Sequence, residues 1–174
     1  MKTDQPTAAT SAEAADDGAI MALMELLFFA YRDFTSDPDA ILSEIGFGRA
    51  HHRVIHFVGR HPGLRVSELL SILRITKQSL GRVLRELIEK GLIYQKEGES
   101  DRRQRLLFLT GEGRALHERL AAPQKARLRA AISAAGGKAA ARPFAAVLLQ
   151  MTDAAEREAV RRLTGWQEPG EEDG

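Results

Sequence analysis

The chain has 174 residues, the length of one ordinary domain that can bury a sizeable hydrophobic core. Its hydrophobic fraction of 44% and charged fraction of 28% exclude an intrinsically disordered chain and are typical of a soluble globular protein. The absence of cysteine excludes disulfides, thiolate metal sites and thiol-based peroxide sensing, and favours a cytoplasmic location. The longest apolar run, Ile20–Ala30, is too short to span a bilayer and contains Glu25, so we expect no membrane association. We also expect no cofactor.

The net charge of +1 conceals a strong asymmetry along the chain. Residues 1–45 hold 2 Lys/Arg against 9 Asp/Glu, a net charge of −7. Residues 46–132 hold 18 against 8, a net charge of +10, and residues 133–174 hold 5 against 7, a net charge of −2. A basic middle segment between acidic ends predicts a binding surface for a polyanion, and a solvated arginine-rich helical surface is the alternative.

The N-terminal part combines a polar tail with a strongly apolar helix. Residues 1–17 are small, polar and acidic, which predicts a disordered acidic tail. A first helix is predicted from a cap at Asp16 or Asp17 to about Phe34. Its apolar residues cover so much of the circumference that a partner subunit would supply part of their cover, with a central helix of a monomer as the alternative. Residues 35–45, around Pro38, are expected to form a connection.

A second helix is predicted from about Gly48 to Arg60, before a proline-glycine stop. It is rich in histidine, and His52 and His56 stand four residues apart, a spacing at which two imidazoles can share a metal ion. A third ligand would have to come from elsewhere, so we favour structural or interfacial histidines and expect no metal site. A ligand cleft or titration near pH 6.5 are further alternatives.

Two helices joined by a tight turn follow, at Val66–Leu73 and Lys77–Lys90. Thr76 is expected to cap the second of them, which has one apolar stripe and, on its opposite face, mostly polar and basic residues. Gly81 lies on that polar face and would let the backbone approach a partner closely, whereas tight packing against another helix is the alternative. Gly91 is expected to end the helix.

The next segment predicts a β-hairpin with a charged tip. Residues 92–96 and 104–109 alternate as strands do, and the tip between them contains Arg102 and Arg103. Two exposed arginines suit a narrow, electronegative minor groove, and Asp101 could orient one of them through a bidentate ion pair.

The C-terminal part predicts two more helices and an acidic tail. Thr110 is expected to cap a long helix from about Glu112 to Ala135, which Pro123 should kink or divide. Gly136 and Gly137 end it, and a last helix is predicted from about Pro143, at its first turn, to Leu163. Residues 166–174 form an acidic C-terminal tail.

These residues resemble the MarR family of bacterial transcription regulators. The resemblance is carried by VSELLSILRITKQSLGRVLRELIEKGLIYQ at 66–95, by DRR at 101–103 and by LTGEGRAL at 109–116, and it covers roughly residues 18–165. It implies a mainly α fold, a winged helix-turn-helix with a two-stranded β-wing and N- and C-terminal dimerisation helices. In one MarR-like domain over 18–165, residues 18–45 and 111–165 would dimerise and residues 46–110 would bind DNA. One departure is Arg74, where relatives often have a glycine in a left-handed conformation.

The resemblance further implies a homodimer that binds a pseudo-palindromic double-stranded DNA operator, most often as a repressor relieved by a small aromatic or phenolic effector. Carried over by position, the polar face of the fourth helix would contact the major groove, the wing arginines would reach the minor groove, and Asp101 would orient the wing. The expected DNA-binding residues are Lys77, Gln78, Ser79, Arg82, Arg85, Arg102 and Arg103.

Polar residues near the first two helices are the candidates for the ligand cleft: Tyr31, His51, His52 and Arg53. A winged-helix module that binds a protein instead of DNA is the alternative function, against which the basic middle segment argues. No nucleophile elbow, phosphate loop or paired carboxylates occur in the sequence, so we do not expect an enzyme.

Overall fold

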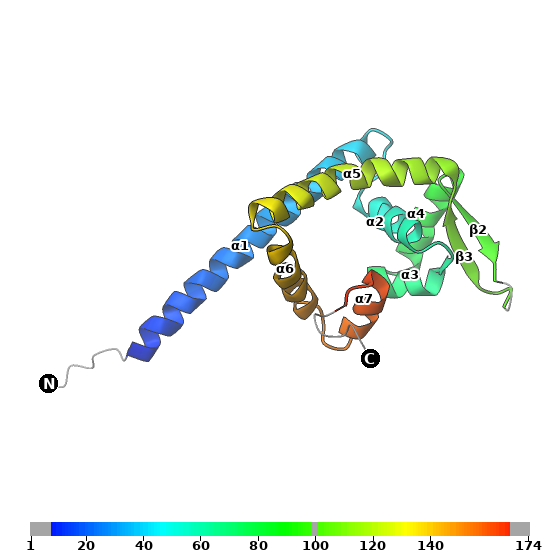
Figure 1. Cartoon of the computed structure of the whole chain (residues 1–174). Coiled ribbons are helices and arrows are strands. Elements are labelled where there is room, and N and C mark those ends of the chain that lie inside the picture. Colours follow the sequence, from blue (N-terminus) through cyan, green and yellow to red (C-terminus); the bar gives the residue numbers. More distant parts are fainter. Residues whose placement is uncertain (1–7, 99–100, 168–174) are drawn as a thin grey trace. The chain divides into compact units, whose positions relative to one another are not determined.

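The computed structural model describes residues 8–98 and 101–167, and side chains from residue 16 onward within that part. The chain is mostly helical with one small sheet (Figure 1), and it divides into two compact units, residues 1–124 and 125–174. The predicted grouping of residues 18–165 into one domain stays a prediction. The elements in chain order are α1 (Ala8–Ser43), α2 (Arg49–Arg60), β1 (Leu64–Arg65), α3 (Val66–Leu73), α4 (Lys77–Glu89), β2 (Ile93–Glu97), β3 (Arg105–Leu109), α5 (Gly111–Ala134), α6 (Lys138–Gln150) and α7 (Arg157–Thr164).

Helix α1 begins earlier than the sequence analysis predicted. It starts at Ala8, so the prediction of a disordered tail over residues 1–17 is wrong for residues 8–17, while residues 1–7 lie outside the described part. The reason is local, because this stretch is rich in alanine, the residue with the highest helix propensity, and has no proline or glycine before Gly18.

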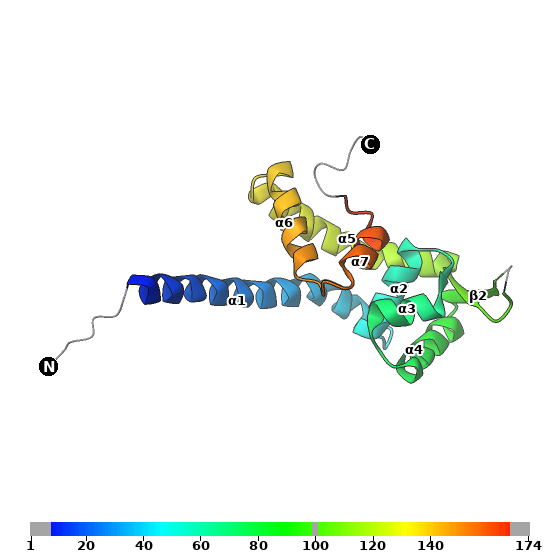
Figure 2. The same cartoon turned by 90° about the horizontal axis from the view of Figure 1, so that it is seen from below.

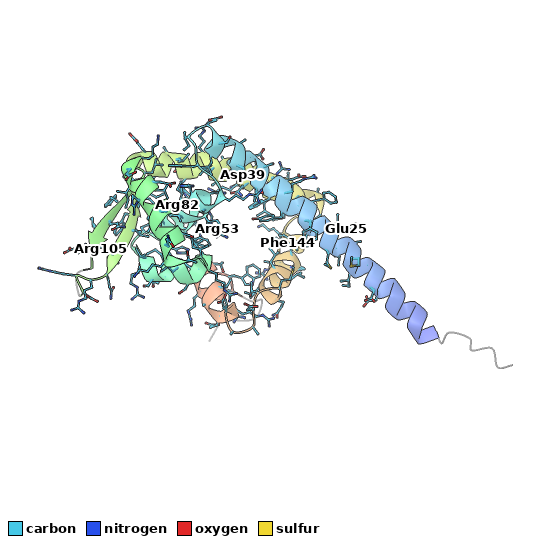
Figure 3. All side chains as sticks on the ribbon, turned by 180° about the vertical axis from the view of Figure 1, so that it is seen from behind. Glu25, Asp39, Arg53, Arg82, Arg105 and Phe144 are labelled. Atoms are coloured by element: carbon cyan, nitrogen blue, oxygen red, sulfur yellow. The ribbon has the colours of Figure 1, made fainter. Side chains whose placement is uncertain are left out.

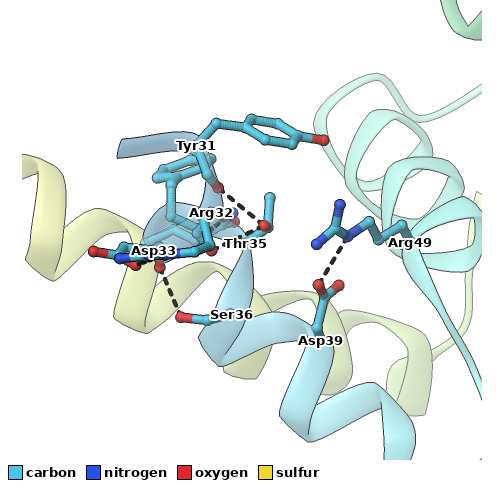
Figure 4. Close-up of polar contacts among 9 residues, drawn as sticks. Tyr31, Arg32, Asp33, Thr35, Ser36, Asp39 and Arg49 are labelled. Atoms are coloured by element: carbon cyan, nitrogen blue, oxygen red, sulfur yellow. Dashed lines mark hydrogen bonds and ion pairs between the residues drawn. The ribbon is translucent and has the colours of Figure 1, made fainter. Parts of the chain in front are cut away.

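Helix α1 also continues through Pro38 to Ser43, where a connection over residues 35–45 was predicted. Proline lacks the N–H that would bond to the carbonyl four residues earlier, which here belongs to Phe34. The side-chain amide of Gln124 in α5 donates to that carbonyl at 3.1 Å. The Thr35 hydroxyl donates to the carbonyls of Tyr31 and Arg32 at 2.9 and 3.2 Å (Figure 4). The freed carbonyl is thus satisfied by tertiary contact, so the helix is not interrupted.

The core of the first unit lies between α2, α3, α4 and the sheet, with the C-terminal end of α1 and the start of α5 against it. Helix α2 has nearly the predicted bounds and buries Val54, Ile55 and Val58 completely. In Figure 2, α2, α3 and α4 lie together beside the hairpin, and the N-terminal part of α1 extends away from them. The other core residues that are at least 98% buried include Leu42, Leu69, Leu80, Val83, Leu87, Ile93, Leu107 and Leu120.

The turn between α3 and α4 has the conformation that glycine usually adopts. Arg74 lies in the left-handed region, at φ 49° and ψ 45°, which costs about 1 kcal/mol for a residue with a Cβ. Its N–H donates to the Leu70 carbonyl at 2.9 Å, and Arg53 of α2 donates to the Leu73 carbonyl at 3.4 Å. The turn geometry is therefore kept although Arg74 replaces the glycine that relatives often have.

Both predicted helix caps at threonine are confirmed. Thr76 Oγ1 accepts the Ser79 N–H at 3.1 Å at the start of α4. Thr110 Oγ1 accepts the Gly113 N–H at 3.0 Å at the start of α5, and it donates to the Gly91 carbonyl at 2.6 Å. Gly91, at φ 69°, ends α4 as predicted, so Thr110 joins the end of α4 to the start of α5.

The wing is part of a three-stranded antiparallel sheet in the order β1-β3-β2. Strand β2 pairs with β3 from Ile93 opposite Leu109 to Glu97 opposite Arg105, and β1 pairs with the other edge of β3. The short strand at Leu64–Arg65 ties the start of α3 to the hairpin, so α3 and the wing are joined through backbone hydrogen bonds.

The second unit contains the end of α5 and the helices α6 and α7. Helix α5 runs through Pro123 without division, and Gly136 and Gly137, both at positive φ, follow its end as predicted. The prediction of one last helix over 143–163 is wrong, because α6 begins before Pro143 and ends at Gln150. The Arg157 guanidinium donates to the Gln150 carbonyl at 2.8 Å, and the Thr152 hydroxyl donates to the Leu149 carbonyl at 2.7 Å. These side chains occupy carbonyls at the end of α6 and stabilise the break.

Candidate nucleic-acid interface

An open groove of about 750 Å³ lies between the exposed face of α4 and the wing. Five of its lining residues are basic and one is acidic, so the groove is suited to an anionic partner. Figure 3 shows Arg82 on α4 and Arg105 on the hairpin among the side chains of this part. The lining residues are Arg65, Val66, Ser67, Lys77, Gly81, Leu84, Arg85, Ile88, Glu89, Gln95, Arg103, Gln104 and Arg105.

The residues expected to bind DNA are all exposed, at two places. Lys77, Gln78, Ser79, Arg82 and Arg85 lie on α4, and Arg102 and Arg103 lie at the tip of the hairpin. Of these, Lys77, Arg85 and Arg103 line the groove. The structure thus brings residues of α4 and of the wing tip to one surface, which their separation in the sequence does not by itself establish.

Two groove arginines, Arg65 and Arg105, were not among the expected DNA-binding residues. Arg65 ends β1 and pairs with Glu68 at 2.7 Å, and Arg105 begins β3 and pairs with Glu97 at 2.9 Å. The strand alternation around Arg105 was the available signal, because it places Arg105 and Gln95 on opposite strands of the hairpin but on one side of it.

Asp101 shapes the wing tip in a different way from the one predicted. Its carboxylate accepts the backbone N–H of Arg103 at 2.9 Å, and its carbonyl accepts the N–H of Gln104 at 3.0 Å. Within the described part of the chain, the expected ion pair with an arginine side chain is not formed. Asp101 therefore fixes the backbone of the turn and leaves the Arg103 guanidinium available.

Gly81 lines the groove, on the exposed face of α4. A Cβ added there would meet no atom within 4 Å, so tight packing against another helix does not explain this glycine. The apolar stripe of the same helix is buried at Leu80, Val83, Leu84 and Leu87, whereas Ile88, which continues its spacing, is 39% exposed. Ile88 faces the groove instead.

The four residues expected to line a ligand cleft are divided between two sides of α2. His51 contacts Glu86 of α4, and Arg53 contacts the end of α3. Tyr31 lies under the Arg49 guanidinium at 5.7 Å, and Arg49 pairs with Asp39 at 2.8 Å (Figure 4). His52 lies on that side too. Burial lowers the pKa of His52, and the nearby Asp39 partly opposes this shift. The structure brings Tyr31 and His52 near the Asp39–Arg49 pair, and it does not bring His51 and Arg53 there.

His52 and His56 meet a third imidazole, His117 of α5, which the sequence analysis did not include. The His56 and His117 rings lie 5.8 Å apart, and a Cβ at Gly59 would come within 2.9 Å of the His117 ring. Glycine at 59 therefore leaves room for His117 beside α2. Among the residues that the structure describes, no group of three or more His, Cys, Asp or Glu side chains has an arrangement that could hold a metal ion.

Acidification is expected to destabilise the first unit through these histidines. Burial, together with the nearby His117, lowers the pKa of His56 from 6.5 to about 4. Between those values the unfolded chain binds more protons than the folded one, so stability falls as the pH falls from about 6.5 to about 4. The partly exposed ring should contribute roughly 1–2 kcal/mol of this loss, less than the full shift implies.

Thermal melts at several pH values between 7 and 4 measure this effect. His56→Leu removes the titrating group and should flatten the pH dependence of the melting temperature relative to the wild type. An equally steep dependence in the variant would show that His56 is not responsible. Burial also lowers the pKa of His52 and His61, so part of the slope should remain.

A helix pair with a tight turn, an exposed second helix and an adjoining basic hairpin together define a winged helix-turn-helix protein. The family model described as "MarR family" matches residues 45–104. The HTH-type transcriptional regulator PetP of Rhodobacter capsulatus is 52% identical over 134 residues, which cover 77% of this chain and 80% of that relative. The chain belongs to the MarR family, whose members are DNA-binding transcription regulators and not enzymes.

Solved structures of low sequence identity have the same fold. S. aureus MepR in a DNA-binding conformation is 19% identical, covers 74% of this chain and 95% of its own, and has a TM-score of 0.63. A MarR family regulator from Silicibacter pomeroyi is 21% identical, covers 80% of this chain and 92% of its own, and also has a TM-score of 0.63. In the described part of the chain, no helix is long and apolar enough to cross a membrane.

Proposed function

We propose that the protein is a homodimeric, sequence-specific repressor in which α4 enters the major groove of its operator and the wing reaches an adjacent minor groove. The observation that carries this proposal is the basic groove between α4 and the hairpin. Its lysine and arginines would neutralise phosphates and release counterions, which supplies salt-dependent affinity. Base contacts from the α4 side chains Lys77, Gln78, Ser79, Arg82 and Arg85 would supply the sequence preference.

The open position at Gly81 supports close approach of the α4 backbone to DNA. Gly81→Ala should raise the free energy of unfolding by about 0.5–1 kcal/mol, because alanine is the better helix former and its methyl group meets no atom. The same methyl group should weaken operator binding. Chemical denaturation and a gel-shift titration measure the two effects, which have opposite signs.

Gly18→Ala is the matched control, because it adds the same methyl group to an open position of α1. Operator affinity should be unchanged in this variant. Equal operator affinity in wild type and Gly81→Ala would contradict close approach at Gly81.

The wing arginine Arg103 is proposed to contact the minor groove or its phosphates. Arg103→Ala should weaken binding to many sequences and reduce the slope of log K against log salt by about 1, the effect of one lost phosphate contact. The backbone contact with Asp101 is kept in this variant, so the tip should remain folded.

Lys96→Ala is the control for the loss of a positive charge from the same hairpin. Lys96 lies on the other side of the hairpin from the groove, with its ammonium group near the rings of Tyr94 and Phe108. Its salt slope should remain close to that of the wild type. Equal slopes in wild type and Arg103→Ala would exclude the proposed contact.

The proposed dimer uses the apolar surface of α1. Ten large apolar side chains between Ile20 and Phe34 are 37–68% exposed, more than a monomeric protein leaves to solvent on one helix. A second copy of the chain is the partner that the family membership supports. Two-fold symmetry would then place two half-sites about 10 base pairs apart in a pseudo-palindromic operator.

The effector is proposed to be a small aromatic or phenolic acid that relieves repression. The Tyr31 ring, the Arg49 guanidinium and half-buried His52 offer an aromatic surface, a cation and a polar tip on one side of α2. A thermal-shift screen with benzoate and hydroxybenzoates, followed by gel shift, tests this class. Stabilisation together with DNA release is the expected result, and neither effect across the screen would contradict it.

Selection of bound DNA from a random pool, with gel shifts at several salt concentrations, tests the proposed function as a whole. A reporter gene behind the selected sequence then distinguishes repression from activation. Absence of salt-dependent DNA binding by the purified dimer would favour the alternative, a winged-helix module that binds a protein.

A further inference from the structure

Glu86 of α4 joins a partly buried residue of α2 to an exposed residue of the proposed DNA-binding face. Its Oε2 atom lies 2.6 Å from His51 Nε2, and its Oε1 atom lies 3.9 Å from Arg82 Nε. The His51 side chain is only 12% exposed, whereas the Arg82 side chain is 77% exposed. One oxygen of the carboxylate thus contacts the partly buried His51, and the other lies near Arg82 on the exposed face of α4.

His51 is itself held on two sides. Its ring stacks on Phe47 with centroids 4.2 Å apart and an interplanar angle of 4°, and the Gly48 N–H donates to Nδ1 at 3.2 Å. An Nδ1 that accepts a hydrogen bond carries no proton, so Nε2 carries the ring hydrogen and donates it to Glu86. A neutral imidazole is therefore enough to hold Glu86. The other charged residues beside this contact, Glu89 and Lys90, line the same shallow cleft as Phe47.

We propose that His51 and Glu86 are positioning residues for Arg82 and thereby contribute to operator specificity without touching DNA. The inference rests on the proposed function of α4. A long arginine side chain samples many rotamers, and a fixed carboxylate one helical turn away reduces them toward the geometry of a base contact. An exposed arginine–glutamate pair is weak by itself. The stacked, hydrogen-bonded His51 strengthens the arrangement because it holds the Glu86 carboxylate in place.

Glu86→Gln tests the proposal in the full-length protein. Sequences are first selected with the wild type, and dissociation constants are then measured for the selected duplex and for a random duplex. The specificity ratio is the dissociation constant for the random duplex divided by that for the selected duplex. It should fall about tenfold in Glu86→Gln, within the range of a weakened base contact. Affinity for random DNA should stay equal or rise, because the variant removes a negative charge near the phosphates.

Glu112→Gln is the control, because it removes the same charge from an exposed position of α5 that does not line the groove and leaves Glu86 in place. Its specificity ratio should equal that of the wild type. Equal losses of the ratio in the two variants would attribute the effect to charge alone and overturn the positioning role.

Two substitutions of His51 separate positioning from packing. His51→Gln keeps an N–H donor near the place of Nε2 and should retain most of the specificity. His51→Phe keeps the ring on Phe47 but has no donor, and its specificity ratio should fall as in Glu86→Gln. Retention of the ratio in folded His51→Phe, verified by its melting temperature, would overturn the proposal.

A double-variant comparison links the effect to Arg82. Glu86→Gln should cause no further loss of specificity in an Arg82→Ala background, because both changes remove the same contact. Additive losses would overturn the proposal even if both single variants lose specificity. If the wild type selects no sequence, the proposed function fails and this inference fails with it. If the wild type selects a sequence and every His51 and Glu86 variant keeps the wild-type specificity, the inference alone fails.

Discussion

Replacing Gly113 with alanine is expected to lower the free energy of unfolding by about 3 kcal/mol, because the new methyl group has no space. An added Cβ would overlap the Leu92 carbonyl oxygen and lie 3.3 Å from the Leu109 Cβ. The overlapping atoms belong to the backbone, so they cannot move away as the end of a flexible side chain could. Chemical denaturation measures the change.

The Gly113→Ala substitution should also disturb the attachment of the wing to α5. The Leu92 carbonyl accepts the Thr110 N–H at 3.0 Å, so the residue that Gly113 contacts joins β2 to the start of α5. Gly111→Ala is the matched control, because its Cβ would be 4.0 Å from the nearest atom, at the end of the Arg114 side chain. Equal stability of Gly113→Ala and Gly111→Ala would show that the space at Gly113 is not limiting.

Replacing Phe28 with glutamate is expected to dissociate the proposed dimer and to weaken operator binding by at least about a hundredfold. Phe28 is 68% exposed on α1, so the change should leave the fold of one chain intact. A charge buried in an apolar interface is strongly unfavourable, and a monomer loses the gain in affinity that comes from binding two half-sites at once. Analytical ultracentrifugation and gel shift measure the two effects.

Ser36→Glu adds the same charge to an exposed polar position of α1 and should leave both the dimer and DNA binding intact. A dimeric Phe28→Glu variant would place the interface elsewhere. A monomeric variant that binds the operator at wild-type affinity would instead contradict the need for two coupled half-sites.

The winged helix-turn-helix could be predicted from the sequence because its signals are local. The Thr76 and Thr110 hydroxyls accept backbone N–H groups three residues later, and Gly91 ends α4 within its own turn. The apolar stripe of α4 likewise repeats within a few residues and identifies its exposed face. These signals also led to the surface positions of the α4 side chains and of the wing arginines.

The contacts that organise the candidate site could not be predicted, because their partners are far apart in the sequence. Arg65 reaches the groove through the pairing of β1 with β3, and His51 contacts a carboxylate 35 residues away. Within the residues that the structure describes, a local contact takes the place of the predicted ion pair of Asp101. A backbone N–H two residues away lies closer to a short side chain than a guanidinium at the end of a flexible one.

The sequence by itself thus determined the two helices of the helix-turn-helix, their caps, the wing hairpin and the basic character of the central segment, because propensity, periodicity and charge act within a few residues. Only the tertiary structure decided whether α1 continues through Pro38. That depends on Gln124, which supplies the hydrogen bond to the Phe34 carbonyl that proline cannot supply. A carbonyl that loses its helical partner can be satisfied by a side chain that the fold brings to it, and local sequence does not identify that side chain.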